Sequence, residues 1–183
     1  MRNTGATAIS GAIMRAASIS GTSSTRCCAI CCGVAVHKSE VVDATYRAYL
    51  RGHHWGIYGD VVGTLRALQN RGMVLGVISN WDTDLLNILA DLGLSGYFAD
   101  IIPSALVGLR KPNPALFELA LERLGVSPGE CLHVGDADDA DGEGPLAAGM
   151  HSLIIDRHTE GELGVHAPGL TVIRDLSHVL DYV

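Results

Sequence analysis

The chain has 183 residues, of which 48% are hydrophobic and 18% are charged, and its formal net charge is -7. This length and composition predict one compact domain with a hydrophobic core, and they exclude an intrinsically disordered protein. All 20 acidic residues follow residue 39, and such an acidic body argues against a nucleic-acid-binding surface, which needs clustered Lys and Arg.

Residues 1–36 are rich in Ala, Ser, Thr and Gly and show no sustained hydrophobic period. We therefore predict a disordered segment outside the core. Two explanations compete for this segment: an organelle transit peptide, or a non-native start produced by gene truncation or a misassigned first exon. An ordered segment is the remaining alternative.

The compartment follows from the apolar runs and the cysteines. No run approaches the roughly 18 to 20 apolar residues that span a bilayer. Cys131 lies in a short apolar run and reads as a buried reduced thiol. We expect a soluble cytoplasmic protein without a membrane partner, or an organellar one if residues 1–36 are a transit peptide.

The rest of the chain alternates segments of helical spacing with short apolar runs typical of strands buried on both faces. In chain order the pattern predicts a helix from Ser39 to Gly52, a helix over 60–70, a strand over 74–78, a helix over 82–92, a short strand over 101–102, a helix over 114–124, a strand over 131–134, a short helix over 145–148, strands over 152–155 and 171–173, and a helix from Ser177. This alternation predicts an α/β fold with a mostly parallel sheet and helices on both faces.

Polar side chains that suit a phosphate site lie after two of these strands and before one helix. Ser79 and Asn80 follow one strand, Asp136 and then Asp141 follow another, and Lys111 lies on the loop before the helix at 114. Ligands of parallel sheets bind just beyond the carboxyl ends of the strands. A hydroxyl, an ammonium and carboxylates able to hold Mg²⁺ suit phosphoryl transfer. Each group also has an ordinary alternative: Ser79 and Asn80 as a helix cap, Lys111 as a surface lysine, and the acidic residues as a solvated loop.

Four stretches carry a family resemblance: Gly76-Val-Ile-Ser-Asn80, Leu109-Arg-Lys-Pro-Asn-Pro114, His133-Val-Gly-Asp136 through Asp141, and Ala147-Ala-Gly-Met150. Together they resemble the haloacid dehalogenase (HAD) superfamily of hydrolases, in particular the phosphatase-like subfamily with an α-helical cap inserted after the first strand. The resemblance covers about Trp55 to Ile155.

The resemblance implies a Rossmann-like core and assigns a role to each candidate residue. Ser79 and Asn80 would bind the phosphoryl group of a small phosphorylated metabolite. Lys111 would stabilise charge on the phosphate and the nucleophile, and Asp136 would hold Mg²⁺ with help from Asp141. Asp136 favours a phosphomonoester phosphatase over the alternative of a 2-haloacid dehalogenase.

One family motif is missing from the sequence. Members of the superfamily attack phosphorus with the first Asp of an Asp-x-Asp-x-Thr motif on the first strand, and nothing before Ser79 matches it. The nearest fragment has Val41 where the nucleophile belongs. We therefore expect the first catalytic strand and most of the cap to be absent, with residues 37–56 as a helical remnant of the cap and residues 57–183 as the core domain.

A chain without a nucleophile should be an impaired or inactive hydrolase. Two alternatives stay open. A carboxylate from elsewhere, such as Asp43 or a partner chain, would supply the nucleophile, or the protein would be a non-catalytic phosphate-binding, magnesium-binding or protein-interaction module. A missing strand would also expose apolar surface, so a homodimer is a further expectation.

Overall fold

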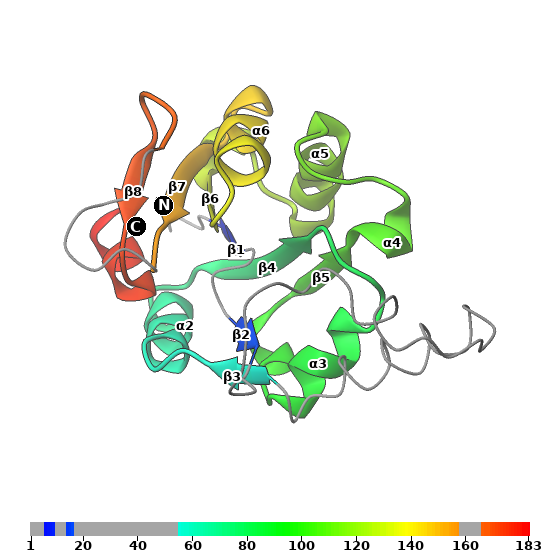
Figure 1. The fold of residues 1–183 in the computed structure, drawn as a ribbon, viewed down its shortest axis with the longest axis vertical. Helices are drawn as coiled ribbons and strands as arrows, with labels where there is room; N and C mark the ends of the chain where they lie inside the picture. The colour runs from blue at the N-terminus through cyan, green and yellow to red at the C-terminus, as the bar shows by residue number, and fades with distance from the viewer. Residues whose placement is uncertain (1–5, 10–13, 17–54, 158–165) are drawn as a thin grey trace, which may run out of the picture.

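A six-stranded parallel sheet forms the centre of the molecule (Figure 1). The computed structural model describes residues 6–9, 14–16, 55–157 and 166–183. The strand order is β5-β4-β1-β6-β7-β8. The strands are β1 (Ala6–Ile9), β4 (Val74–Ser79), β5 (Asp100–Pro103), β6 (Cys131–Gly135), β7 (His151–Ile155) and β8 (Thr171–Ile173). The predicted α/β class with a mostly parallel sheet is confirmed.

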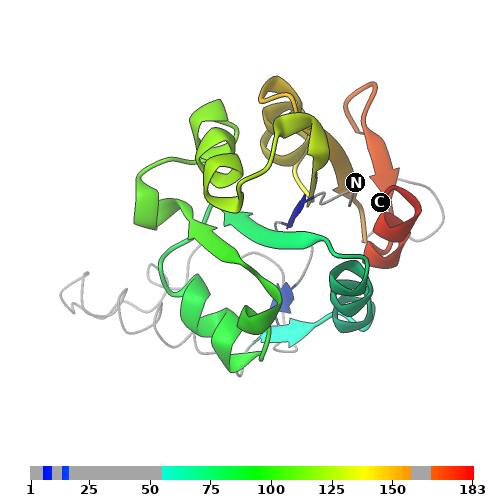
Figure 2. The ribbon, with the colours of Figure 1, turned by 180° about the vertical axis from the view of Figure 1, so that it is seen from behind.

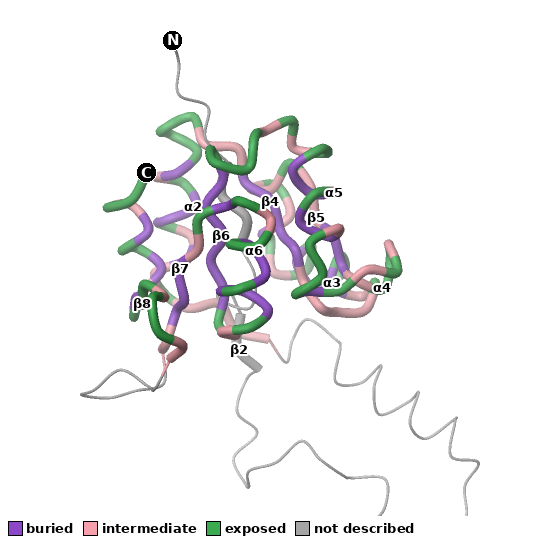
Figure 3. Tube along the Cα trace, turned by 90° about the horizontal axis from the view of Figure 1, so that it is seen from above, coloured by how far each residue is buried: buried purple, intermediate pink, exposed green. Residues whose placement is uncertain are grey.

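Helices cover both faces of this sheet, as predicted. They are α2 (Val61–Asn70), α3 (Leu85–Asp91), α4 (Ser104–Val107), α5 (Pro114–Leu124) and α6 (Gly144–Ala147), with 3-10 helices at Ser95–Tyr97, Pro128–Glu130 and Leu176–Asp181 and a π-helix at Asp138–Glu143. Apolar side chains of α2, α3 and the last 3-10 helix form one core cluster with β4, β6, β7 and β8. Side chains of α5 form a second cluster on the opposite face, around Phe117 and Ile78. Strands β4, β6 and β7 are therefore largely buried between two helical layers (Figure 3).

Local sequence signals explain the best-defined helix, α5. Asn113 caps it, because its side chain accepts a hydrogen bond from the backbone N–H of Ala115, and Pro114 occupies the first turn. Gly125 ends the helix in the left-handed conformation, with φ of 67°. These boundaries match the predicted helix over 114–124.

The strand β1 corrects the prediction that residues 1–36 lie outside the core and that the first strand is absent. Ala6–Ile9 pair with β4 on one side and with β6 on the other, in the middle of the sheet (Figure 2). The core therefore does not begin at residue 57. A run of four residues with two alanines is too short and too weakly apolar to show a strand period.

A small second sheet corrects another boundary. Met14–Ala16 (β2) and Trp55–Ile57 (β3) pair antiparallel, so Trp55 and Gly56, which were assigned to the helical remnant, lie in a strand. The rest of the predicted helix from Ser39 lies outside the described residues. Near the carboxyl end, the helix expected from Ser177 is the 3-10 helix Leu176–Asp181.

The candidate phosphate-binding edge is one end of the main sheet. A hollow of about 360 Å³ lies at the other end, beside the first residues of β6, β7 and β8, and Leu132, His151 and Thr171 are among the residues that line it. Across the described residues, no helix combines the length and the apolar character that crossing a membrane requires.

Candidate phosphate-binding site

The strand register places Ser79 and Asp136 at the same level on either side of β1. Ile9 is paired with Val77 of β4 and with Val134 of β6. Ser79 and Asp136 each come two residues later, at the carboxyl end of their strand. Because neighbouring strands lie about 4.8 Å apart, the two backbones are separated by about 10 Å across the end of β1. The predicted phosphate site would lie in this gap.

The sequence directly after β1 contains no acidic residue. The two residues that follow Ile9 in the sequence are Ser10 and Gly11, and the first acidic residue of the chain is Glu40. The strand predicted to be absent is therefore present, but the acidic residues of the Asp-x-Asp-x-Thr motif do not accompany it.

Asn80 holds the backbone of Lys111 with two hydrogen bonds. Its Oδ1 accepts from the Lys111 backbone N–H at 2.8 Å, and its Nδ2 donates to the Lys111 carbonyl at 3.0 Å. The phosphate-binding role expected for Asn80 stays a prediction. The contact that the structure shows fixes the loop that carries Lys111.

The Lys111 ammonium is buried and paired with Asp141. Its Nζ lies 2.5 Å from Asp141 Oδ1, and the two side chains are only 3% and 2% exposed. The same Oδ1 lies 2.7 Å from His133 Nε2, and Asp141 Oδ2 accepts from the Ala137 backbone N–H at 3.2 Å. The side chains of Lys111 and His133 and the backbone N–H of Ala137 thus meet at one carboxylate.

The charges in this cluster follow from burial and hydrogen bonding. Burial by itself would raise the pKa of Asp141, but the hydrogen bond of His133 and the ammonium of Lys111 hold it well below its usual range. Burial lowers the pKa of His133, so the imidazole is neutral at pH 7 and its Nε2–H donates to Asp141. In the part of the chain that is described, His133 Nδ1 is buried without a hydrogen-bond partner.

Gly135 is required by the close approach of Asp141. A Cβ atom at position 135 would collide with the Cβ, Cγ and Oδ2 atoms of Asp141. The backbone of Asp141 is anchored as well, because its carbonyl accepts from Ser152 Oγ at 2.6 Å. Glycine before Asp136 therefore lets the following loop fold back over the strand end.

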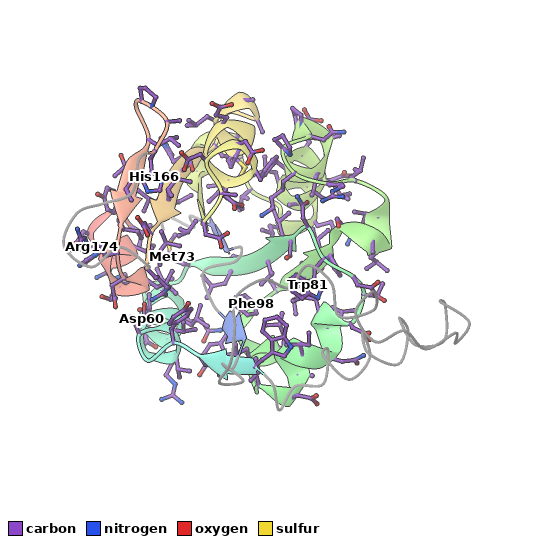
Figure 4. The ribbon with its side chains drawn as sticks, in the orientation of Figure 1. Asp60, Met73, Trp81, Phe98, His166 and Arg174 are labelled. Carbon is purple, nitrogen blue, oxygen red and sulfur yellow. The ribbon has the colours of Figure 1, made fainter. Side chains whose placement is uncertain are left out.

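The acidic loop leaves Asp136 as its best candidate metal ligand. Asp136 is exposed, whereas both oxygens of Asp141 are engaged as described. Asp138 is also engaged: its Oδ1 lies 2.7 Å from His166 Nδ1, and its Oδ2 accepts from the Ala167 backbone N–H at 2.7 Å. The position of His166 is labelled in Figure 4. Over the described ranges, no group of three or more His, Cys, Asp or Glu side chains is arranged to hold a metal ion. The metal role of Asp141 stays a prediction.

His166 contacts carboxylates with both ring nitrogens. Its Nε2 lies 3.4 Å from Asp156 Oδ2, in addition to the contact of Nδ1 with Asp138. The hydrogen bond to Asp138 raises the pKa of His166. A protonated imidazole donates to both carboxylates, so it ties the loop after β6 to the residue after β7.

His133 belongs to one of the motifs that carry the family resemblance, but the sequence analysis predicted no role for it. The available signal was a titratable residue inside the otherwise apolar run Cys131-Leu-His-Val134. Trp81, directly after Asn80, also received no role. Its ring meets that of Trp55 edge to face with centroids 5.4 Å apart, so an aromatic pair lies next to the loop of Ser79.

Comparisons with known proteins agree with this geometry. A family model described as haloacid dehalogenase-like hydrolase matches residues 33–149. A mouse protein, haloacid dehalogenase-like hydrolase domain-containing protein 3, is 34% identical over 144 residues, which are 78% of this chain and 57% of that protein. Glyceraldehyde 3-phosphate phosphatase of Methanopyrus kandleri is 37% identical over 106 residues, 55% of this chain and 43% of that protein. The chain spans about half the length of these curated relatives.

Solved structures show the same fold. The crystal structure of a HAD phosphatase from Thermococcus onnurineus superposes with a TM-score of 0.66 and 28% sequence identity, covering 81% of this chain and 65% of that one.

Proposed function

This chain belongs to the haloacid dehalogenase-like hydrolase family, and we propose that it binds small phosphate monoesters at the carboxyl edge of its sheet. The ligand would lie over the end of β1, between Ser79 and Asp136, with Lys111 beside it. We further propose that hydrolysis by this chain is impaired, because the residues directly after β1, Ser10 and Gly11, include no carboxylate.

The buried Lys111 ammonium is the observation that carries this proposal. A charged amine that is 3% exposed and held by Asp141 is costly to bury and is fixed in place. Positive charge fixed at the carboxyl edge of a parallel sheet is suited to a phosphoryl group. Ser79 adds a hydroxyl at the end of the neighbouring strand.

The relatives support a phosphate ester as the ligand. The name of one of them, glyceraldehyde 3-phosphate phosphatase, specifies a small phosphorylated metabolite. A phosphoryl ligand therefore agrees better with the site than a haloacid does.

Asp136 would hold Mg²⁺ together with the ligand. Mg²⁺ is usually bound by one or two carboxylates plus substrate phosphates, and Asp136 is an exposed carboxylate at the strand end. When bound, the ion would supply positive charge against the phosphoryl oxygens. Because Asp136 is the best-placed carboxylate for it among the described residues, Mg²⁺ and phosphate should each strengthen the binding of the other.

Two further expectations remain proposals. We propose no nucleic-acid partner, because the body of the chain is acidic, and a cytoplasmic location, because the buried thiol of Cys131 suits a reducing compartment. The argument for a homodimer is weaker, because β1 fills the middle of the sheet and the apolar gap expected there does not arise. Size-exclusion chromatography with light scattering decides the oligomeric state.

Binding and hydrolysis are tested separately on the full chain. Isothermal titration with inorganic phosphate is run with and without MgCl2, and p-nitrophenyl phosphate tests turnover. We expect phosphate binding that Mg²⁺ strengthens, and turnover several orders of magnitude below that of a phosphatase with an intact nucleophile. Absence of phosphate binding under all conditions would refute the first proposal, and vigorous turnover would refute the second.

A pair of serine variants makes the binding test specific. Ser79→Ala removes the hydroxyl at the strand end and should weaken phosphate binding about tenfold, the loss expected for one hydrogen bond to a charged group. Ser95→Ala, in the 3-10 helix Ser95–Tyr97, is the matched control and should bind phosphate as the parent does. Equal affinities for the two variants would remove Ser79 from the site.

A further inference from the structure

We infer that His133 is a positioning residue for this site: its Nε2–H orients the Asp141 carboxylate, which in turn holds the Lys111 ammonium. The inference rests on the proposed phosphate-binding function, in which the position of that ammonium matters. Asp141 Oδ1 accepts from Lys111 Nζ and from His133 Nε2, at 2.5 and 2.7 Å.

The Lys111–Asp141 pair needs an anchor of this kind. A lysine reaches its partner through a flexible four-carbon stem, and a carboxylate turns about its Cβ–Cγ bond. The contact of Asp141 Oδ2 with the Ala137 N–H is longer, at 3.2 Å. The His133 contact is therefore the better restraint on the plane of the carboxylate.

His133 is itself held rigidly. It lies in β6, which pairs with β1 on one side and β7 on the other. Its side chain is 0% exposed. The ring of Phe117 meets the imidazole edge to face, with centroids 5.5 Å apart and an interplanar angle of 90°. The donor that orients Asp141 is thus fixed by the sheet and by α5.

The packing of β6 does not by itself require a histidine. All five residues of this strand are buried, an environment that an apolar side chain suits better. The imidazole leaves Nδ1 buried without a partner among the described residues, and such an unsatisfied atom destabilises the fold. The interaction that the imidazole gains in return is the hydrogen bond from Nε2–H to Asp141.

Two substitutions separate this role from packing. His133→Gln keeps an N–H donor at nearly the position of Nε2, whereas His133→Met has similar length and no donor. The first readout is the ¹H–¹⁵N signal of the Lys111 ammonium, which is visible only when its protons are held and exchange slowly. The second is the dissociation constant for inorganic phosphate in the presence of MgCl2, measured on the full chain.

We expect His133→Gln to keep the Lys111 signal and to bind phosphate within about threefold of the parent. His133→Met should lose the signal and bind phosphate about tenfold more weakly, in the range that indirect partners of a binding group affect. If His133→Met does not fold, His133→Phe replaces it as the variant without a donor.

The outcomes are distinguishable. Retention of both the Lys111 signal and the parental affinity in the variant without a donor would overturn the positioning role. Loss of both properties in His133→Gln as well would mean that the imidazole acts through shape, which also overturns it. If the parent itself does not bind phosphate, the proposed function fails, and the Lys111 signal alone decides the role of His133.

Discussion

The buried pair of Lys111 and Asp141 should show strong energetic coupling in a double-mutant cycle. The atoms are 2.5 Å apart and the side chains are 3% and 2% exposed. At an effective dielectric constant of about 20, two unit charges at this distance attract by about 7 kcal/mol, and loss of hydration offsets much of that. Removing one partner leaves an uncompensated buried charge, so Lys111→Met or Asp141→Asn should each lower the unfolding free energy by about 3–5 kcal/mol.

The double variant removes both charges and should be less destabilised than the two single losses together. We expect a coupling energy of about 2–3 kcal/mol. Urea denaturation of the four proteins, followed by circular dichroism, measures it, provided that the denaturant slopes agree. Losses that simply add, within about 0.5 kcal/mol, would show that the two charges do not stabilise each other.

Two other contacts give simpler predictions. Asp60→Ala breaks the contacts of Asp60 Oδ2 with Arg157 Nη2 at 2.8 Å and with the backbone N–H of Leu176 at 2.6 Å; thermal unfolding should show a loss of about 1–3 kcal/mol, with the exposed Asp91→Ala nearly neutral as control. The contact with Asp138 raises the pKa of His166 in the folded protein. The stabilisation that this contact gives is therefore complete below the unfolded-state pKa of histidine, about 6.5, and disappears as the pH rises through the folded-state pKa. The difference in melting temperature between the parent and His166→Gln should therefore be largest near pH 6 and small near pH 9; a difference independent of pH would contradict the ionised contact.

The sequence predicted those elements whose signal is local. The apolar run Val74–Ile78, and the Asn and Pro at the start of α5 with Gly125 at its end, identify themselves without tertiary information. The position of Asp136 at a strand end followed in the same way, from an apolar run that ends in glycine.

The parts that the sequence did not reveal depend on distant partners. The strand Ala6–Ile9 is recognisable only through its pairing with β4 and β6. The Asn80 amide binds the backbone of Lys111, and His133 binds Asp141. The hydrophobic pattern of the sequence does not indicate that these residues are in contact. Nothing in the composition of these segments distinguishes such roles from capping or packing.

The middle position of β1 has a consequence for how this protein folds. Strand β1 joins the half of the sheet formed by β5 and β4 to the half formed by β6, β7 and β8. Residues 6–9 leave the ribosome long before their partner residues 131–134 are made. Contacts so remote along the chain are slow to form, so the nascent protein must keep its sheet open until β6 emerges and should depend on chaperones during that interval.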